Sequence, residues 1–349
     1  MRAVAALSAG LLVAAACSGG GSTSPSDGTG EAAQADDLPA EDDAPAGELT
    51  VLTYNVAGLP QEISEVNPEE HIPLISPLLN AYDVVLTQED FDWWVPLLDS
   101  LDFANYHDRL RAEATHEHRS QPHPGPEAVG IDTATRPDLS VGDGLGYLSR
   151  LPFTGETRVP WQGCFGGLDT SDGGAGDCLS MKGFGMVTVT LAGDAPLDAG
   201  GAEGDITVDV YNLHAEAGST DQDQRLRAEQ FDQLAAFIEE HSAGQAVILG
   251  GDTNLDSDDD RPERAAADAE IWARFLDRTG LVDTCTELGC DDPHRIDRIA
   301  YRNGGGVTLQ PTSYDVPQQR FQAPDGEDLS DHLPVVAGFA WRATSSASG

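Results

Sequence analysis

Apolar, strand-like segments that stop at a polar side chain recur along this chain, and they constrain its fold more than any other feature. Residues 49–55 alternate and are rich in β-formers, and residues 83–89 form a short apolar run that ends in a carboxylate. Later segments end in the same way, and the polar residues at all these ends are Asn55, Glu89, His214, Asp252 with Asn254, Asp297, and Asp331 with His332. Because rigid scaffolds present reactive groups on loops at strand ends, the pattern predicts one site shared by several strands.

Each of these residues, taken alone, has an ordinary structural explanation. Asn55 and Asp252 are typical turn residues, Glu89 is explained as a surface acid, and His214 as a half-buried histidine with a satisfied partner. Six strand ends that behave alike favour the functional explanation over the ordinary one.

Strand-like segments dominate the chain, and a few helical segments lie between them. This order predicts an α/β (α+β) domain with four layers, in which two packed mixed β-sheets are flanked by helices. The clearest helix is 221–241, because its apolar residues fall on one face. The expected helices are 72–81, 93–101, 221–241 and 265–279, and the expected strands are 49–55, 83–89, 144–149, 185–191, 206–213, 246–250, 296–301 and 333–341. Residues 104–140 are polar and rich in His and Pro, and no element is assigned to them.

The first 17 residues resemble a bacterial lipoprotein signal peptide. Arg2 supplies a short positive region, and the apolar run 3–16 is too short to span a bilayer. Three alanines precede Cys17, which would carry the lipid after cleavage; an ordinary cleaved signal peptide is the alternative. Either reading predicts an exported protein, anchored to a bacterial membrane or secreted.

Composition divides the rest of the chain. Residues 18–47 are small and polar and cannot bury enough surface to offset chain entropy, which predicts a disordered tether. Residues 48–342 form the expected domain, and residues 343–349 are a frayed tail. No segment beyond the signal peptide is apolar enough to be a transmembrane candidate.

Four cysteines remain after Cys17, and an even count in an exported protein predicts two disulfides. Among the three possible connectivities, local pairing of Cys164 with Cys178 and of Cys285 with Cys290 is favoured. A zinc site is disfavoured because the cysteine spacings are wrong and no histidines lie nearby in a suitable pattern.

The charge balance limits the possible partners. The chain holds 19 basic and 60 acidic residues, a formal charge of −41. Such a surface repels the phosphate backbone, so nucleic acid is an unlikely partner. Carboxylates do hold hard cations such as Mg²⁺ and Ca²⁺.

The segments at the strand ends together resemble the motifs of the endonuclease/exonuclease/phosphatase superfamily, which includes deoxyribonuclease I and secreted neutral sphingomyelinases. Thr53-Tyr-Asn-Val-Ala-Gly-Leu-Pro60, Gln88-Glu89, Tyr211-Asn-Leu-His214, Gly250-Gly-Asp-Thr-Asn254, Ile296-Asp-Arg-Ile299 and Ser330-Asp-His-Leu-Pro334 occur in the family's order. The resemblance covers about 49–341 and implies a deoxyribonuclease I-like fold. Gly-Asp-x-Asn followed by Ser-Asp-His is specific as a set, whereas Gln-Glu alone carries little weight.

The resemblance also implies a role for each residue. Glu89 corresponds to the main Mg²⁺ carboxylate, with Asn55 beside it and Asp331 as a further metal-site acid. Asp252 and Asn254 correspond to the pair that orients the attacking water and touches phosphate. His214 contacts the phosphate or protonates the leaving oxygen, and Asp297 orients His332, the second histidine. We expect His332 to be the base and His214 the acid, with Asp252 as the alternative base.

The chemistry of this set is coherent for phosphoester hydrolysis. Mg²⁺ prefers oxygen ligands and keeps several waters, so one or two carboxylates suffice to hold it; Mn²⁺ or Ca²⁺ are possible substitutes. A cation on a non-bridging oxygen offsets the charge of the phosphodiester. Two histidines supply proton transfer near neutral pH, and a carboxylate behind one imidazole fixes its tautomer.

The substrate is indicated only by weaker features. The segment from Cys164 through Lys182-Gly-Phe184 resembles a stretch of secreted sphingomyelinase-like members, and Lys182 would then contact phosphate; the alternative is an ordinary surface lysine. The lipid anchor and the acidic charge favour a phospholipid phosphodiester such as sphingomyelin, or a small organic phosphate. The alternatives are an extracellular nuclease and a non-catalytic surface-binding module.

Overall fold

A computed structural model describes residues 44–95, 105–191, 205–257 and 261–344, in which twelve strands form two six-stranded sheets. In sheet 1 the spatial order is β11 (Val307–Asp315), β12 (Val335–Ala343), β1 (Ala46–Asn55), β2 (Val84–Gln88), β4 (Gly146–Ser149) and β3 (His118–Arg119). In sheet 2 the order is β5 (Phe153–Pro160), β6 (Gly183–Thr190), β7 (Thr207–His214), β8 (Val247–Asp252), β10 (Asp297–Arg302) and β9 (Val282–Asp283). Each sheet is mixed, because β1 and β2 run parallel in one and β7 and β8 in the other.

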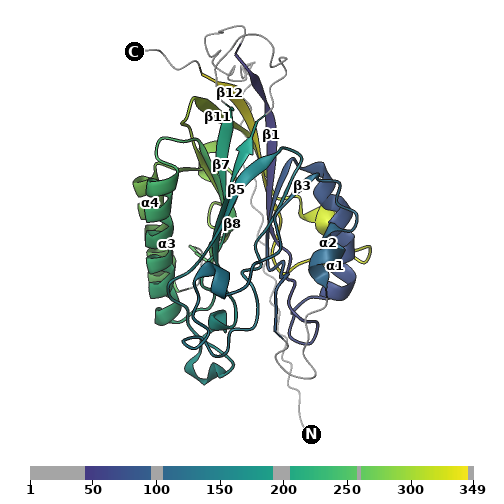
Figure 1. Cartoon of the computed structure of the whole chain (residues 1–349), viewed down its shortest axis with the longest axis vertical. Helices are drawn as coiled ribbons and strands as arrows, with labels where there is room; N and C mark the ends of the chain where they lie inside the picture. The colour runs from purple at the N-terminus through teal and green to yellow at the C-terminus, as the bar shows by residue number, and fades with distance from the viewer. Residues whose placement is uncertain (1–43, 96–104, 192–204, 258–260, 345–349) are drawn as a thin grey trace, which may run out of the picture. The chain divides into compact units, whose positions relative to one another are not determined.

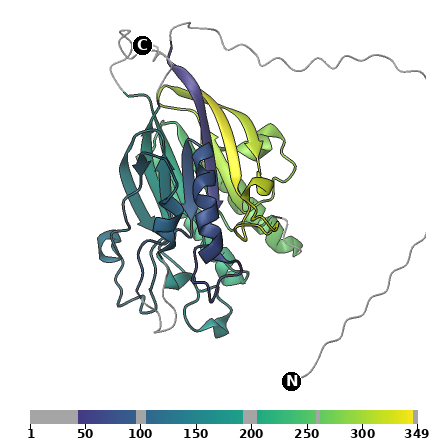
Figure 2. The same cartoon turned by 90° about the vertical axis from the view of Figure 1, so that its right-hand side faces the viewer.

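Helices cover the outer face of each sheet (Figures 1 and 2). Sheet 1 carries α1 (Pro68–Leu78) and α2 (Tyr106–Arg111), and sheet 2 carries α3 (Asp221–His241) and α4 (Pro262–Thr279). The shorter elements are α5 (Thr284–Leu288), η1 (Leu79–Ala81), η2 (Glu127–Val129), η3 (Thr170–Asp172), η4 (Asp177–Leu179) and η5 (Gln318–Phe321). The predicted four-layer sandwich of two mixed sheets between helices is confirmed.

Three apolar clusters hold the layers together. The largest fills the space between the sheets, with Val51 and Leu86 of sheet 1 against Val210 and Ile248 of sheet 2. A second cluster packs α3 and α4 on sheet 2, and a third packs α1 and α2 on sheet 1. Burial of this area is the main favourable contribution to folding.

Helix α3 shows how local sequence sets an element. Thr220 accepts a hydrogen bond from the backbone N–H of Asp223, whose side chain accepts from the backbone of Thr220, so a capping box begins the helix. Phe231, Leu234 and Ile238 then lie buried against sheet 2. The predicted bounds of this helix are confirmed.

Strand direction gathers the polar strand ends at one end of the sandwich. The parallel strands β1 and β2 end together, and so do β7 and β8. The antiparallel strands β10 and β12 begin at that same end, because Asp297 pairs with Asp252 and Val335 pairs with Thr53. One edge of both sheets therefore carries all the predicted site residues at strand ends.

The predicted helix 93–101 is wrong where the structure describes it. Trp94 makes an antiparallel bridge with Val141, and residues 93–95 are not helical. Both tryptophans of this segment are half-buried. Trp94 instead packs beside Phe91 and Val141 from a loop, so the apolar spacing here does not reflect a helix. Residues 96–101 lie outside the described part of the chain.

The first and last described strands begin and end close to the predicted bounds of the domain. β1 begins at Ala46, two residues inside the predicted tether 18–47, and β12 ends at Ala343 rather than at Arg342. The reason is pairing, because Ala46 stands opposite Arg342 at the end of the shared ladder. The predicted signal peptide 1–17 with Cys17, and most of the predicted tether, lie outside the described residues.

Both predicted disulfides are present, between Cys164 and Cys178 and between Cys285 and Cys290. The first closes the loop between β5 and β6, and the second lies where α5 ends. Among the described helices, none combines the length and the apolar character needed to cross a bilayer.

Candidate active site

Asn55 connects the two sheets at the site. It is fully buried at the end of β1, and its Nδ2 donates to Oε1 of Glu89 (3.1 Å) and to Oδ2 of Asp252 (3.2 Å). Its Oδ1 accepts from the backbone N–H of Ala57 (3.0 Å). One amide therefore joins a carboxylate from each sheet.

Glu89 leaves β2 through an unusual backbone turn. Its φ is +55°, a value that side-chain-bearing residues rarely adopt and that concentrates at functional sites. Glycines make room for this turn, because a Cβ at Gly58 would overlap the carbonyl oxygen of Glu89, and a Cβ at Gly144 would lie 3.0 Å from its Cα. The turn brings the Glu89 carboxylate to Asn55, and its second oxygen has no hydrogen bond in the described part of the chain.

Sheet 2 contributes His214 and Asp252 from two neighbouring parallel strands. His214 Nε2 lies 3.2 Å from Oδ2 of Asp252, and both side chains are almost completely buried. The opposite ring nitrogen of His214, Nδ1, is buried and has no hydrogen-bond partner among the described residues. Asn254 lies just beyond, where its N–H donates to Asp252 Oδ1 (3.0 Å) and its Nδ2 donates to the carbonyl of Ala215 (3.1 Å).

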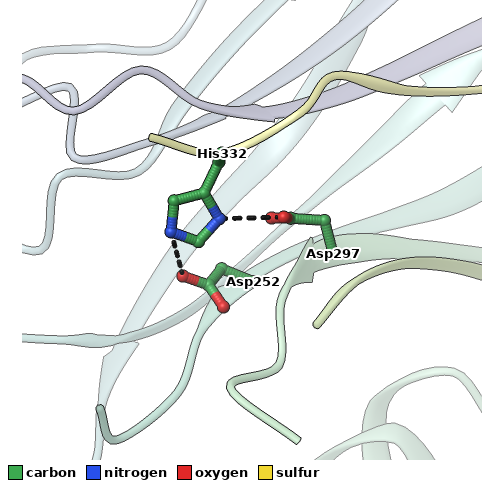
Figure 3. A group of neighbouring side chains, drawn as sticks. All are labelled: Asp252, Asp297 and His332. Atoms are coloured by element: carbon green, nitrogen blue, oxygen red, sulfur yellow. Dashed lines mark hydrogen bonds and ion pairs between the residues drawn. The ribbon is translucent and has the colours of Figure 1, made fainter. Parts of the chain in front are cut away.

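His332 stands between two carboxylates (Figure 3). Its Nδ1 lies 2.8 Å from Oδ2 of Asp297, and its Nε2 lies 3.7 Å from Oδ2 of Asp252. The other oxygen of Asp297 is buried without a hydrogen-bond partner in the described chain. These three side chains offer ligand atoms within 4.8 Å of one another, which is a possible metal-holding group.

Burial and ion pairing set the charges of these groups. Burial alone would raise the pKa of Asp252, but His332, His214 and Lys182 outweigh it and hold the pKa well below its usual range. Burial alone would lower the pKa of His332, but Asp297 and Asp252 hold it well above its ordinary value. The ion pairs therefore favour the ionised form of Asp252 and the protonated form of His332.

Lys182 approaches the site from the segment that leads into β6. Its Nζ lies 2.5 Å from Oδ1 of Asp177 and donates to the carbonyl of Ala215 (3.5 Å). Burial opposes its charge, yet Asp177, Glu89 and Asp252 raise its pKa. Lys182 is thus a half-buried, ion-paired cation in the field of the site carboxylates.

The ligand types fit a hard cation at Glu89. Within the described residues, one oxygen of its carboxylate accepts no hydrogen bond, whereas Asn55 turns its Nδ2 towards both carboxylates and its Oδ1 towards the N–H of Ala57. Asp331 is exposed and accepts from the hydroxyl of Ser330 (3.3 Å), beside His332. Oxygen donors of this kind suit Mg²⁺, which keeps several waters.

Sequence reasoning did not find the buried acids behind Lys182. Glu216 accepts hydrogen bonds from the N–H of Phe165 (2.6 Å) and from Nε2 of Gln230 (3.1 Å). Burial first, and then Asp177, raise its pKa to about 8. Only the position of Glu216, two residues after His214, signalled its place in the site.

Carboxylates, amides and two histidines thus lie together at one end of a four-layer sandwich. A sequence model of the Endonuclease/Exonuclease/phosphatase family matches residues 52–332. The chain belongs to this family.

Two curated relatives are sphingomyelinases of Mycobacterium bovis and Mycobacterium tuberculosis. Each is 32% identical over 321 residues, which covers 87% of this chain and 55% of the relative. The chain therefore spans about half the length of the curated relatives that it matches.

Solved structures share the fold. Sphingomyelinase C from Streptomyces griseocarneus superposes with a TM-score of 0.54 at 20% identity, covering 84% of this chain and 99% of that one. A beta toxin variant from Staphylococcus aureus, crystallised with bound magnesium ions, gives a TM-score of 0.54 at 16% identity, covering 83% of this chain and 99% of that one. At these identities the likeness concerns the fold alone.

Proposed function

We propose that the protein is an exported, metal-dependent phosphodiesterase that acts on a phospholipid such as sphingomyelin or on a small organic phosphate. The observation that carries this proposal is the convergence of His214 and His332 on one ionised carboxylate, Asp252, beside Asn55 and Glu89. Family membership and the curated sphingomyelinase relatives support it.

A divalent cation would be held by Glu89, with Asn55 and Asp331 as further oxygen donors, and Mg²⁺ suits these ligands best. Bound there, the cation would offset the negative charge of a phosphate oxygen. Asn55 would serve as a ligand through Oδ1, which requires its amide to turn from the arrangement described above.

The protein's own groups divide the proton transfer between them. Asp252, which is ionised, would orient the attacking water together with Asn254. His332, which Asp297 fixes and keeps protonated, would donate to the phosphate or to the leaving oxygen. These pKa directions favour Asp252 over His332 as the proton acceptor, and His214 and Lys182 would contact the phosphate.

Substrate class follows from charge and from the relatives. A formal charge of −41 opposes polyanions such as DNA, while a single phosphodiester can be drawn to the half-buried cation Lys182. The relatives named sphingomyelinase favour a zwitterionic lipid. The two disulfides support export, and we propose that Cys17 anchors the protein to the membrane through residues 18–47.

The first test is hydrolysis by the purified protein with Mg²⁺ of bis-p-nitrophenyl phosphate, sphingomyelin and plasmid DNA in parallel. We expect turnover of sphingomyelin that EDTA abolishes. Removing the imidazole in His332→Ala should lower kcat by roughly 10²- to 10⁴-fold, because general acid–base catalysis contributes about that much. His241→Ala, at the exposed end of α3, is the control and should keep wild-type kcat.

The pattern of turnover separates the alternatives. Preference for plasmid DNA would support the extracellular nuclease. Mg²⁺ binding without turnover of any substrate would support the non-catalytic binding module. Equal activity in His332→Ala and wild type would exclude the mechanism proposed above.

A further inference from the structure

Below the candidate active site, buried amides join the two sheets in addition to the apolar side chains of the core. Gln88, at the end of β2, donates from Nε2 to Oδ1 of Asn212 on β7 (2.6 Å) and to Oγ1 of Thr53 on β1 (3.1 Å). All three residues are 0% exposed. We call Thr53, Gln88 and Asn212 the inter-sheet clamp.

The side-chain amide of Asn212 makes its hydrogen bonds to the opposite sheet. Its Nδ2 donates to the carbonyl oxygens of Thr87 (2.9 Å) and Gly146 (3.1 Å), while its Oδ1 accepts from Gln88. Asn212 belongs to sheet 2, and all three partners belong to sheet 1. A fully satisfied amide in a low-dielectric interior fixes its surroundings, because any displacement leaves buried polar groups unpaired.

The residues of the inter-sheet clamp lie next to the candidate active-site residues along the same strands, on the side of the core. Thr53 and Asn212 precede Asn55 and His214 by two residues, so each pair shares a face of its strand, and Gln88 directly precedes the Glu89 turn. At the same level the sheets approach closely at Gly250. A Cβ on this glycine would lie 2.8 Å from Cδ1 of Leu86 and 3.4 Å from Cβ of Thr53.

We propose that the inter-sheet clamp sets the distance between the two halves of the active site, and that Gln88 and Asn212 are positioning residues for the reaction. One half stands on sheet 1 and the other on sheet 2, namely Asn55, Glu89 and His332 on the first, and His214, Asp252 and Asp297 on the second. The inference rests on the proposed function, in which groups of both halves act on one phosphate. A misplacement of about 1 Å in such an arrangement lowers a rate by roughly 100-fold.

The test compares Asn212→Leu with its neighbour Tyr211→Phe in the full chain. Leucine keeps the branched arrangement of heavy atoms of Asn212 but removes its hydrogen bonds to sheet 1. We expect kcat to fall roughly 100-fold. The Mg²⁺ Kd, measured by calorimetry, should stay within about twofold, since Glu89 and Asn55 belong to one sheet. Tyr211 is equally buried on β7, but its hydroxyl bonds Ser242 (2.6 Å) on the other face, so its loss should lower the Tm and leave kcat unchanged.

Two results would overturn the proposal. One is a kcat of Asn212→Leu within about threefold of that of Tyr211→Phe, which would mean that the inter-sheet clamp only stabilises the fold. The other is a loss of kcat that is fully accounted for by the fraction of the variant that is unfolded under the assay conditions. If Asn212→Leu does not fold, Thr53→Val replaces it, with an expected kcat loss of about tenfold, and wild-type kcat in this milder variant would equally overturn the proposal.

A substrate-free readout separates this proposal from the proposed function. The ring of His332 belongs to the half on sheet 1 but contacts Asp297 and Asp252 of sheet 2. In Asn212→Leu its NMR signals should therefore shift towards those of a free histidine, and Tyr211→Phe should leave them unchanged. An inactive wild type with this NMR shift would overturn the proposed function only, whereas unchanged signals in Asn212→Leu would overturn the clamp.

Discussion

At the scale of single residues, Glu216 gives the clearest pH-dependent prediction. Burial and Asp177 raise its pKa to about 8, whereas the unfolded chain leaves it near its ordinary value. An acid whose pKa is raised by folding stabilises the fold fully below its unfolded pKa and loses that contribution as pH rises through the folded pKa. The free energy of unfolding should therefore fall by a few kcal/mol between about pH 4.5 and pH 8, relative to Glu216→Gln.

Urea unfolding of wild type and Glu216→Gln at pH 5 and at pH 8.5 measures this difference. Glu229→Gln is the matched control, because Glu229 lies exposed on α3 and its loss should change neither value. A constant difference between wild type and Glu216→Gln across this range would show that Glu216 stays ionised.

The residue scale also shows what sequence can and cannot predict about the site. Motif order placed Asn55, Asp252 and His332 correctly at one end of the fold. Asn212 and Glu216 carried no comparable signal, because a buried amide and a buried acid look in sequence like any strand or loop residue. Their importance comes from partners 124 and 51 residues away, Gln88 and Phe165, which only the packed sheets bring together.

At the scale of elements, helices with strong apolar periodicity and a local cap were predicted correctly, whereas elements with weak patterns were not. The helix 221–241 carries its own capping box and apolar face, so it was predicted to the residue. β5 and β11 were missed because their side chains are mostly exposed or half-buried, and β11 also contains Pro311 at a register shift. The helix expected at 93–101 is wrong at 93–95, the part that the structure describes, because packing against Phe91 and Val141 outweighed its apolar spacing.

The two disulfides make an element-scale prediction that depends on loop length. Cys164–Cys178 has a sequence separation of 14 and Cys285–Cys290 one of 5. Chain-entropy arguments give losses of about 3 and about 2 kcal/mol when each bridge is removed. Guanidinium unfolding of Cys164→Ala/Cys178→Ala and of Cys285→Ala/Cys290→Ala should therefore show the larger loss for the first pair, and the reverse order would contradict the entropic account.

At the scale of the whole molecule, the acidic charge governs the response to salt. With a formal charge of −41, the acidic side chains repel one another in the folded state, and salt screens this repulsion. The Tm of the EDTA-treated protein should rise by several degrees as KCl increases from about 10 mM to about 0.3 M, where the Debye length becomes shorter than most charge separations. A flat Tm over this range, measured by calorimetry, would mean that the acidic groups lie too far apart to interact.

The order of strands in sheet 1 has a consequence for synthesis. β12 lies between β1 and β11 although it is the last strand described, so β1 has no partner on that side until residues 335–343 have been made. His332 emerges only just before them. A partly synthesised chain thus lacks both a strand of sheet 1 and His332 until this part of the sequence has been translated. The candidate active site is therefore incomplete until the last of the described strands has been made, however much of the preceding chain has already folded.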